Sequence, residues 1–141
     1  MANLDWITRQ IAVGCAPSDC LLNALPDLGI SSIVDMRIEA EHNSDKLIRL
    51  GLRYLRLPSD DGHFPSLNNL ENGIAWIKTE LEQGHKVLVH CRYGQGRSVV
   101  MVAAFLIRHG MSWQNALSLI KSLHPDTSPT EEHIAGLMFF Q

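Results

Sequence analysis

A short apolar run, Lys86-Val87-Leu88-Val89-His90, leads directly into Cys91 and a loop that contains two glycines. Hydrophobic residues at successive positions are typical of a parallel strand that helices cover on both sides. The next apolar stretch, residues 98–109, has the length of a core helix and is closed by Gly110. A buried strand, a glycine-containing loop and a helix in this order predict an α/β domain with a site at the carboxyl end of the strand.

Strands and helices alternate along the rest of the chain. Short β-branched or alternating runs predict strands at residues 10–13, 32–36 and 54–57. Spacing and composition predict helices over residues 18–28, 39–50 and 67–84, a further helix capped by Ser112, and a last one over residues 131–140. We therefore expect one domain spanning residues 1–141, with a mostly parallel central sheet, helices on both faces and a helical C-terminal tail.

Composition limits the partners that the chain can have. The 141 residues carry a formal net charge of −3, which gives no overall electrostatic reason to expect nucleic acid or an anionic membrane. The three cysteines lack zinc-like spacing, and no basic-then-apolar leader opens the sequence. The longest apolar run, residues 99–107, is about half of a membrane span. We expect a cytoplasmic protein without nucleic-acid or membrane partners; its oligomeric state is not indicated.

The segment Cys91-Arg92-Tyr93-Gly94-Gln95-Gly96-Arg97-Ser98 combines a nucleophile with the features of an anion site. Backbone N–H groups from Arg92 to Arg97 can turn inward around a tetrahedral dianion, and the helix N-terminus adds partial positive charge. Gly94 and Gly96 lower the steric cost of such a loop. The same field favours the thiolate form of Cys91, which makes this residue the candidate nucleophile.

Side chains of the same segment complete the predicted site. Arg97 can donate two parallel N–H bonds to phosphate oxygens, and Ser98 can donate a hydrogen bond to the sulfur of Cys91. Arg92 and Tyr93 lie on the rim, where they could influence substrate choice. The residues expected to bind substrate phosphate are Arg92, Tyr93, Gly94, Gln95, Gly96 and Arg97.

The pattern His90-Cys91, five further residues and Arg97-Ser98 resembles the signature of cysteine-dependent protein tyrosine phosphatases, especially small atypical dual-specificity phosphatases. The resemblance covers nearly the whole chain and includes the segment Ile33-Val34-Asp35-Met36-Arg37, in which Asp35 and Arg37 are expected to form a structural pair. It implies hydrolysis of phosphotyrosine, and of phosphoserine or phosphothreonine, in a phosphorylated protein. The implied intermediate is a phosphocysteine on Cys91, and no metal or other cofactor is implied.

A phosphatase of this kind needs an acid that protonates the leaving oxygen, on a loop that can move. In resembling phosphatases the acid precedes a short stretch ending in proline. Asp61-Gly62-His63-Phe64-Pro65 matches that form better than a stretch beginning at Asp60 does. We therefore expect Asp61 to be the acid and keep Asp60 as the alternative.

Two positions depart from the resembling proteins. Those proteins often hold the hydrolytic water with a glutamine near the end of a Thr-x-x-Gln stretch, whereas Thr130-Glu131-Glu132-His133 carries His133 there. His133 or Gln95 could hold the water instead, and His133 could equally be an ordinary helix-surface residue. His124 stands where arginine is usual, which is expected to remove a fixed positive charge near the site.

Other functions remain open at this point. Relatives with similar loops act on lipid or inositol phosphates, or on RNA 5′ phosphates. Rhodanese-like sulfurtransferases also place a cysteine after a strand, but their loops are generally shorter than the one that ends at Arg97. A phosphate-binding module without turnover is the non-enzymatic alternative.

Overall fold

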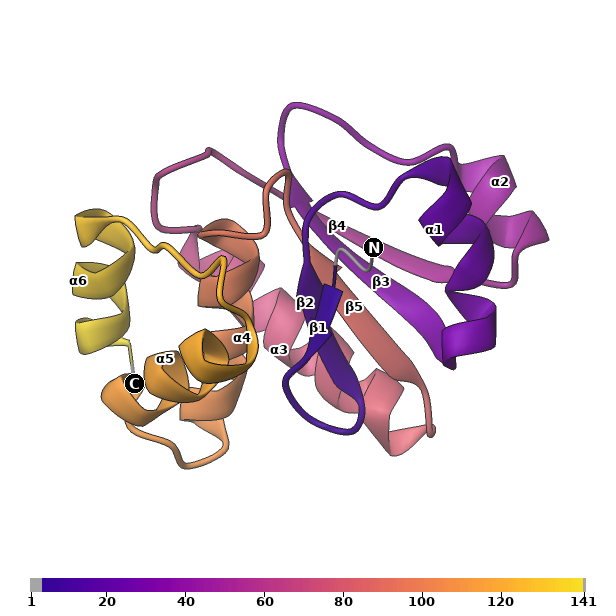
Figure 1. The fold of residues 1–141 in the computed structure, drawn as a ribbon. Helices are drawn as coiled ribbons and strands as arrows, with labels where there is room; N and C mark the ends of the chain where they lie inside the picture. Colours follow the sequence, from indigo (N-terminus) through magenta and orange to yellow (C-terminus); the bar gives the residue numbers. More distant parts are fainter. Residues whose placement is uncertain (1–3, 141) are drawn as a thin grey trace.

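The computed structural model describes residues 4–140 and shows a five-stranded sheet between two layers of helices (Figure 1). The strands are β1 (Leu4–Trp6), β2 (Ile11–Gly14), β3 (Ile30–Arg37), β4 (Arg53–Ser59) and β5 (Lys86–His90). They lie in the order β1-β2-β5-β3-β4, and only β1 pairs antiparallel with its neighbour. The predicted α/β fold with a mostly parallel sheet is confirmed, and β5 is the central strand.

The helices divide between the two faces of the sheet. On one face lie α1 (Asp19–Ala24), a 3-10 turn (Pro26–Leu28) and α2 (Ser44–Arg49). On the other lie α3 (Leu67–Glu82) and α4 (Arg97–Arg108), with α5 (Trp113–Leu123) and α6 (Glu131–Phe139) packed outside α4 (Figure 1). Side chains of β5 alternate between these faces: Val87 and Val89 join the α3/α4 core, and Leu88 joins the α1/α2 core.

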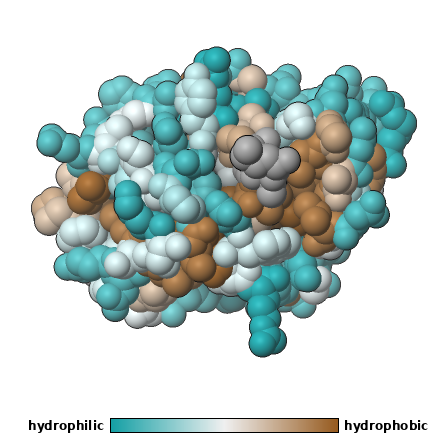
Figure 2. All heavy atoms as spheres, in the orientation of Figure 1, coloured by the Kyte–Doolittle hydropathy of each residue, from teal (hydrophilic) through white to brown (hydrophobic). Residues whose placement is uncertain are grey.

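Helix α4 holds the second layer together. Its residues from Arg97 to Leu106 are buried on every side, as expected of a helix that lies between a sheet and further helices. On the face shown in Figure 2, hydrophilic residues predominate, and hydrophobic residues are exposed in patches between them. Within residues 4–140, no helix combines the length and the apolar character that crossing a membrane requires.

The helix expected over residues 39–50 is wrong in its first half. Helix α2 begins only at Ser44, because the side chain of Asn43 accepts a hydrogen bond from the Lys46 backbone N–H and caps the helix there. Residues 38–43 therefore form a loop after β3, which we call the 38–43 loop. This difference affects the site, because the loop reaches it.

Three smaller differences concern one short additional strand and the ends of two other elements. Strand β1 was not predicted, because three residues are too short for a clear pattern. The helix expected over residues 18–28 stops at Ala24, and a separate 3-10 turn follows, because Pro26 has no N–H for a helical hydrogen bond. Strand β4 continues through Pro58, which is tolerated because β4 is at the edge of the sheet.

Candidate active site

Cys91 follows β5 immediately, at the carboxyl end of the central strand, and is buried. Its Sγ accepts a hydrogen bond from the Gly94 backbone N–H at 3.3 Å and lies 3.2 Å from Oγ of Ser98. A thiolate only accepts hydrogen bonds, so the Ser98 hydroxyl donates to it in that state. The structure thus brings Cys91 and Ser98 into contact, with two donors arranged to stabilise a thiolate.

The outward carbonyl groups of the 91–97 loop meet donors from four parts of the fold. Five carbonyls are bonded in this way: Cys91 by His90 Nδ1 at 2.9 Å, Arg92 by Ala16 N–H at 3.0 Å, Gly94 by His124 Nε2 at 2.6 Å, Gln95 by Ser128 N–H at 2.9 Å and Gly96 by Val100 N–H at 2.8 Å. In a trans peptide, the next N–H points opposite to the carbonyl. The N–H groups of residues 92, 93, 95, 96 and 97 therefore face the inside of the loop, as an anion site requires.

Both glycines of the loop are explained by close contacts. Gly94 has a φ of 71°, and a Cβ there would lie 2.7 Å from the carbonyl carbon of Gly14 at the end of β2. A Cβ on Gly96 would lie 2.5 Å from Cε1 of His133 on α6. Side chains at these positions would push the loop away from the strand and helix that support it.

Arg97 is the first residue of α4, and its side chain is 1% exposed. Its Nη1 donates to Oε1 of Glu39 at 2.7 Å and to the Ser59 carbonyl at 2.9 Å, and its Nη2 donates to Oε2 of Glu39 at 2.9 Å. Its Nε lies 3.7 Å from Oδ1 of Asp61 and has no hydrogen bond to any residue from 4 to 140. The edge of the guanidinium formed by Nε and Nη2 thus keeps two N–H groups, one on each nitrogen, that can donate to two phosphate oxygens.

Glu39 lies on the 38–43 loop and is a site residue that sequence reasoning missed. Hydrogen bonds from Arg97 lower the pKa of Glu39 to about 2, so the carboxylate is ionised near neutral pH. Burial opposes the charge on Arg97, but the hydrogen bond to Glu39 and the charge interactions with Cys91, Glu39 and Asp61 together outweigh it and raise the pKa of the guanidinium. Glu39 therefore fixes one end of the guanidinium and leaves the Nε edge to a ligand.

We expect Glu39→Gln to lower the free energy of unfolding by about 1 kcal/mol near neutral pH, a small value because the Glu39 side chain is 34% exposed and solvent screens the pair. Its folded-state pKa of about 2 lies below the unfolded value of 4.5. The stabilisation is therefore complete above the unfolded value and is lost as the pH falls through the folded value. Urea unfolding at about pH 7 and about pH 3 should show a difference that shrinks by more than half. An equal difference at both would contradict this account.

Both candidate acids lie between β4 and α3, and both are exposed. Asp61 is the one whose carboxylate lies 3.7 Å from Nε of Arg97. The backbone carbonyl of Asp60 accepts a hydrogen bond from His63 N–H, which forms the turn that presents Asp61. We call residues 60–65 the acid loop.

The acid loop is attached to the beginning of α6. Four contacts make this attachment. Thr130 Oγ1 donates to the Gly62 carbonyl at 2.9 Å, and His133 Nε2 donates to the His63 carbonyl at 3.0 Å. Glu132 accepts from the Phe64 N–H at 2.7 Å and lies 3.1 Å from Nδ1 of His63. The ring of Phe64 also packs so closely on Gly136 that no side chain would fit there. Helix α6 thus holds the acid loop near Arg97.

His133 is 1% exposed, so its interpretation as an ordinary helix-surface residue is wrong. Its Nδ1 accepts from the Thr130 N–H at 3.1 Å, which completes a capping box, while Nε2 donates to the acid loop. Burial lowers the pKa of His133, so the ring is neutral near neutral pH. Because both ring nitrogens are engaged and the ring packs on Gly96, His133 connects the acid loop with the 91–97 loop and offers no nitrogen to a water in this arrangement.

His124 also contacts the 91–97 loop and is buried. Its Nε2 lies 2.6 Å from the Gly94 carbonyl, and its Nδ1 lies 2.6 Å from Oδ2 of Asp5 on β1. A carbonyl and a carboxylate only accept hydrogen bonds, so the ring of His124 is the donor in these contacts. His124 therefore connects the carbonyl of Gly94 on the 91–97 loop with Asp5 on β1.

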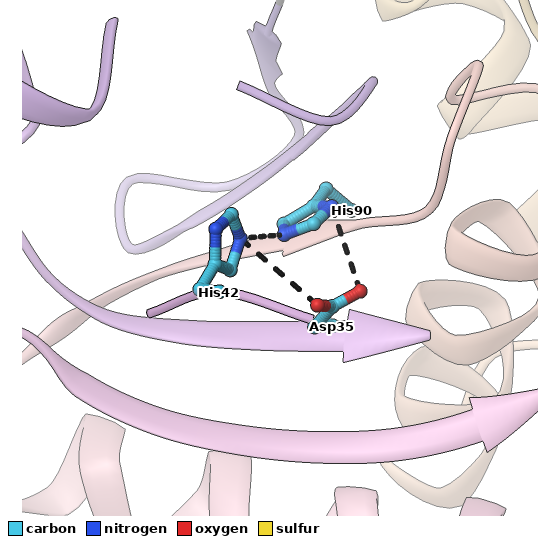
Figure 3. Close-up of side chains that lie close together, drawn as sticks. All are labelled: Asp35, His42 and His90. Carbon is cyan, nitrogen blue, oxygen red and sulfur yellow. Dashed lines mark hydrogen bonds and ion pairs between the residues drawn. The ribbon is translucent and has the colours of Figure 1, made fainter. Parts of the chain in front are cut away.

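Asp35, His42 and His90 form a polar cluster on the α1/α2 side of the sheet (Figure 3). Their possible ligand atoms lie within 4.8 Å of one another, which raises the question of a metal site. Asp35, however, accepts N–H bonds from Arg37 and an O–H bond from Tyr54, and the two imidazoles bond each other. This donor set fits a hydrogen-bonded network rather than a metal centre, and the predicted pairing of Asp35 with Arg37 is confirmed.

Known proteins are similar to this chain in sequence and in fold. The family described as "Dual specificity phosphatase, catalytic domain" matches residues 13–141. Phosphatidylglycerophosphatase and protein-tyrosine phosphatase 1 of Homo sapiens is 32% identical over 133 residues, which cover 86% of this chain and 66% of that protein. The PRL-1 phosphatase of Drosophila melanogaster is 30% identical over 126 residues, which cover 85% of this chain and 71% of that protein.

A solved structure agrees with these matches. The crystal structure of PTPMT1 in complex with PI(5)P superposes with a TM-score of 0.91 at 26% identity, covering 99% of this chain and 94% of that one. The fold and the sequence thus define a cysteine-dependent phosphatase of the protein tyrosine phosphatase superfamily. Within that superfamily, the chain belongs to the dual-specificity phosphatases, as a small atypical member.

Proposed function

We propose that this protein hydrolyses phosphomonoesters through a phosphocysteine on Cys91, with Arg97 as the phosphate-binding side chain and Asp61 as the acid. One observation carries the proposal: the buried Nε of Arg97 lacks a hydrogen-bond partner within residues 4–140. An unpaired buried donor is costly, and a phosphate oxygen would satisfy it. The charge interaction with Cys91 also helps to raise the pKa of Arg97, which supports a role for both residues in one site.

The reaction follows from this arrangement. The Cys91 thiolate attacks phosphorus, so that the S–P bond forms while the P–O bond to the leaving group breaks and Asp61 gives its proton to the leaving oxygen. The inward N–H groups and the free edge of Arg97 stabilise the charge on the remaining phosphate oxygens. Water then attacks the phosphocysteine and returns a proton to Asp61, while the Ser98 hydroxyl stabilises the departing thiolate. Gln95, which is exposed on the loop, is the proposed water-positioning residue.

The proposed substrate is a phosphorylated protein carrying phosphotyrosine, and also phosphoserine or phosphothreonine. A lipid phosphate is the second candidate, because one relative is named a phosphatidylglycerophosphatase and one similar structure was solved with PI(5)P. At the rim, Tyr93 is 54% exposed and the Arg92 guanidinium lies 4.9 Å from its ring centroid. A cation on an aromatic face can contact a phosphopeptide or a lipid headgroup, so the choice requires measurement.

The experiment compares kcat/KM for a phosphotyrosine peptide, a phosphoserine peptide and vesicles containing a phosphatidylinositol phosphate, with a chelator present throughout. We expect the phosphotyrosine peptide to be hydrolysed fastest and acid quenching to trap phosphate on Cys91. A preference of about 100-fold or more for the vesicles would replace the protein substrate with the lipid. Turnover without a phosphoenzyme on Cys91 would overturn the mechanism.

Asp61→Asn is expected to lower kcat by about 10²-fold or more for an aryl phosphate with a basic leaving group, because the leaving oxygen then departs without a proton. With a weakly basic, strongly activated phenol as leaving group, the loss should be much smaller. Asp60→Asn is the matched control, since Asp60 is an exposed neighbour on the same loop, and it should behave as wild type. If Asp60→Asn instead shows the leaving-group dependence, the acid is Asp60.

A further inference from the structure

We propose that His42 is a positioning residue that fixes the ring tautomer of His90 and, through it, the first peptide of the 91–97 loop. This inference rests on the proposed function of that loop. It concerns a residue that lies outside the Cys91-to-Ser98 segment and that contacts neither the nucleophile nor Arg97 in the hydrogen bonds described above. Figure 3 shows the rings of His42 and His90 edge to edge, above Asp35.

The contacts determine where the protons lie. Nδ1 of His90 is 2.9 Å from the Cys91 carbonyl oxygen, which only accepts, so Nδ1 carries the hydrogen. Burial lowers the pKa of His90 to about 4, so near neutral pH the ring is neutral and its Nε2 has a lone pair. Nε2 of His42 lies 2.8 Å from Nε2 of His90 and must therefore donate to its lone pair. The chain of donors runs from His42 to His90 to the Cys91 carbonyl.

The position of His42 is itself fixed. Its backbone N–H donates to the Tyr54 hydroxyl at 3.1 Å, and that hydroxyl donates to Oδ2 of Asp35 at 2.7 Å. Asp35 lies directly opposite His90 in the register of β3 and β5. Burial opposes its charge, but the hydrogen bonds from Arg37 and Tyr54 and the interaction with His90 together outweigh burial and lower the pKa of Asp35, so the carboxylate stays an acceptor. The His42 ring therefore meets His90 at a defined angle of 69° between the ring planes.

Loss of the His42 donor would leave Nε2 of His90 as a buried acceptor without a partner. Unsatisfied buried acceptors are costly, and a neutral imidazole can avoid the cost by moving its hydrogen from Nδ1 to Nε2. That tautomer has no hydrogen for the Cys91 carbonyl. The peptide between Cys91 and Arg92 would then be free to rotate, and its N–H is one of those that face the inside of the loop.

The same 38–43 loop acts on both ends of the 91–97 loop. Glu39 binds Arg97 at the last position, and His42 binds His90 just before the first. The two contacts come from residues three positions apart on one short segment. The His42 contact therefore holds the nucleophile end of the loop, as Glu39 holds the arginine end.

The test compares two substitutions that differ in hydrogen bonding. His42→Gln places an amide N–H near the position of Nε2 and keeps the donor, whereas His42→Leu removes it. We expect His42→Leu to lower kcat for p-nitrophenyl phosphate about tenfold or more, with His42→Gln within about threefold of wild type, because small misplacements of binding groups are costly in catalysis. His85→Leu is the control, since His85 lies before the other end of β5 and bonds Ser31 there.

Nitrogen-15 NMR of the imidazoles gives a readout that does not depend on activity. In the wild type, His90 should show a protonated Nδ1 and an unprotonated Nε2, and His42→Leu should shift the hydrogen toward Nε2. A wild-type His90 protonated on Nε2 would overturn the proposal even if His42→Leu did not fold. Equal kcat losses in His42→Gln and His42→Leu would also overturn it. So would a His42→Leu variant that unfolds at a lower temperature but keeps the wild-type kcat and the wild-type tautomer of His90. Failure of the proposed function would instead appear as a wild type without turnover.

Discussion

Cys91→Ser is expected to abolish turnover, with kcat reduced by at least about 10⁴-fold, while phosphate binding persists. A serine hydroxyl attacks phosphorus only when a base removes its proton. The groups that hydrogen-bond Sγ of Cys91 are the Gly94 N–H and the Ser98 hydroxyl, which can stabilise a thiolate but do not act as a base. The substitution therefore removes the nucleophile and supplies no means of activating its replacement.

Binding should survive because the anion site is built mainly by other groups. The inward N–H groups of the loop and the free edge of Arg97 do not depend on the sulfur. A fluorescence titration with a phosphotyrosine peptide should therefore give Cys91→Ser a dissociation constant within about tenfold of the wild-type KM. Cys20→Ser is the matched control, because Cys20 is exposed on α1, and it should retain wild-type kcat. Turnover by Cys91→Ser within about tenfold of wild type would exclude a phosphocysteine.

The fold and the loop segment could be predicted because their signals are local. Val87, Leu88 and Val89 are hydrophobic on both faces of one strand, and Ser112 and Thr130 cap helices that begin where expected. The 38–43 loop was missed because residues 39–50 have helix-forming composition throughout. Asn43, followed by Ser44 and Asp45, was the available signal for a later helix start.

The support around the loop could not be predicted because it depends on distant pairs. His124 and Asp5 are 119 positions apart in sequence, and Arg97 and Glu39 are 58 apart. Such partners meet only after β1, β3 and α4 have taken their places, and no sequence pattern links them. The water-positioning role considered for His133 shows the same limit, since its burial and its contact with the acid loop arise from how α6 packs.

Arg97→Lys is expected to lower kcat/KM by about 10³-fold, although the charge is kept. The guanidinium uses three N–H groups for Glu39 and the Ser59 carbonyl and still has Nε and one N–H of Nη2 for phosphate. A lysine ammonium has three N–H groups on one atom and cannot serve both sides. Glu39 would also attract the ammonium away from the substrate, because its carboxylate is ionised.

A double substitution tests this competition. If Glu39 draws the ammonium of Arg97→Lys away from phosphate, adding Glu39→Gln to that variant should raise its kcat/KM about tenfold. Glu39→Gln alone should instead reduce kcat/KM, because the guanidinium of Arg97 is then no longer held in place. Arg108→Lys is the matched control, since Arg108 is on the same helix and binds the carboxylate of Glu71 far from the 91–97 loop. If Arg97→Lys lowers kcat/KM by less than about tenfold, one point charge suffices for phosphate binding. If the double variant is no more active than Arg97→Lys, Glu39 orients the arginine without competing for the cation.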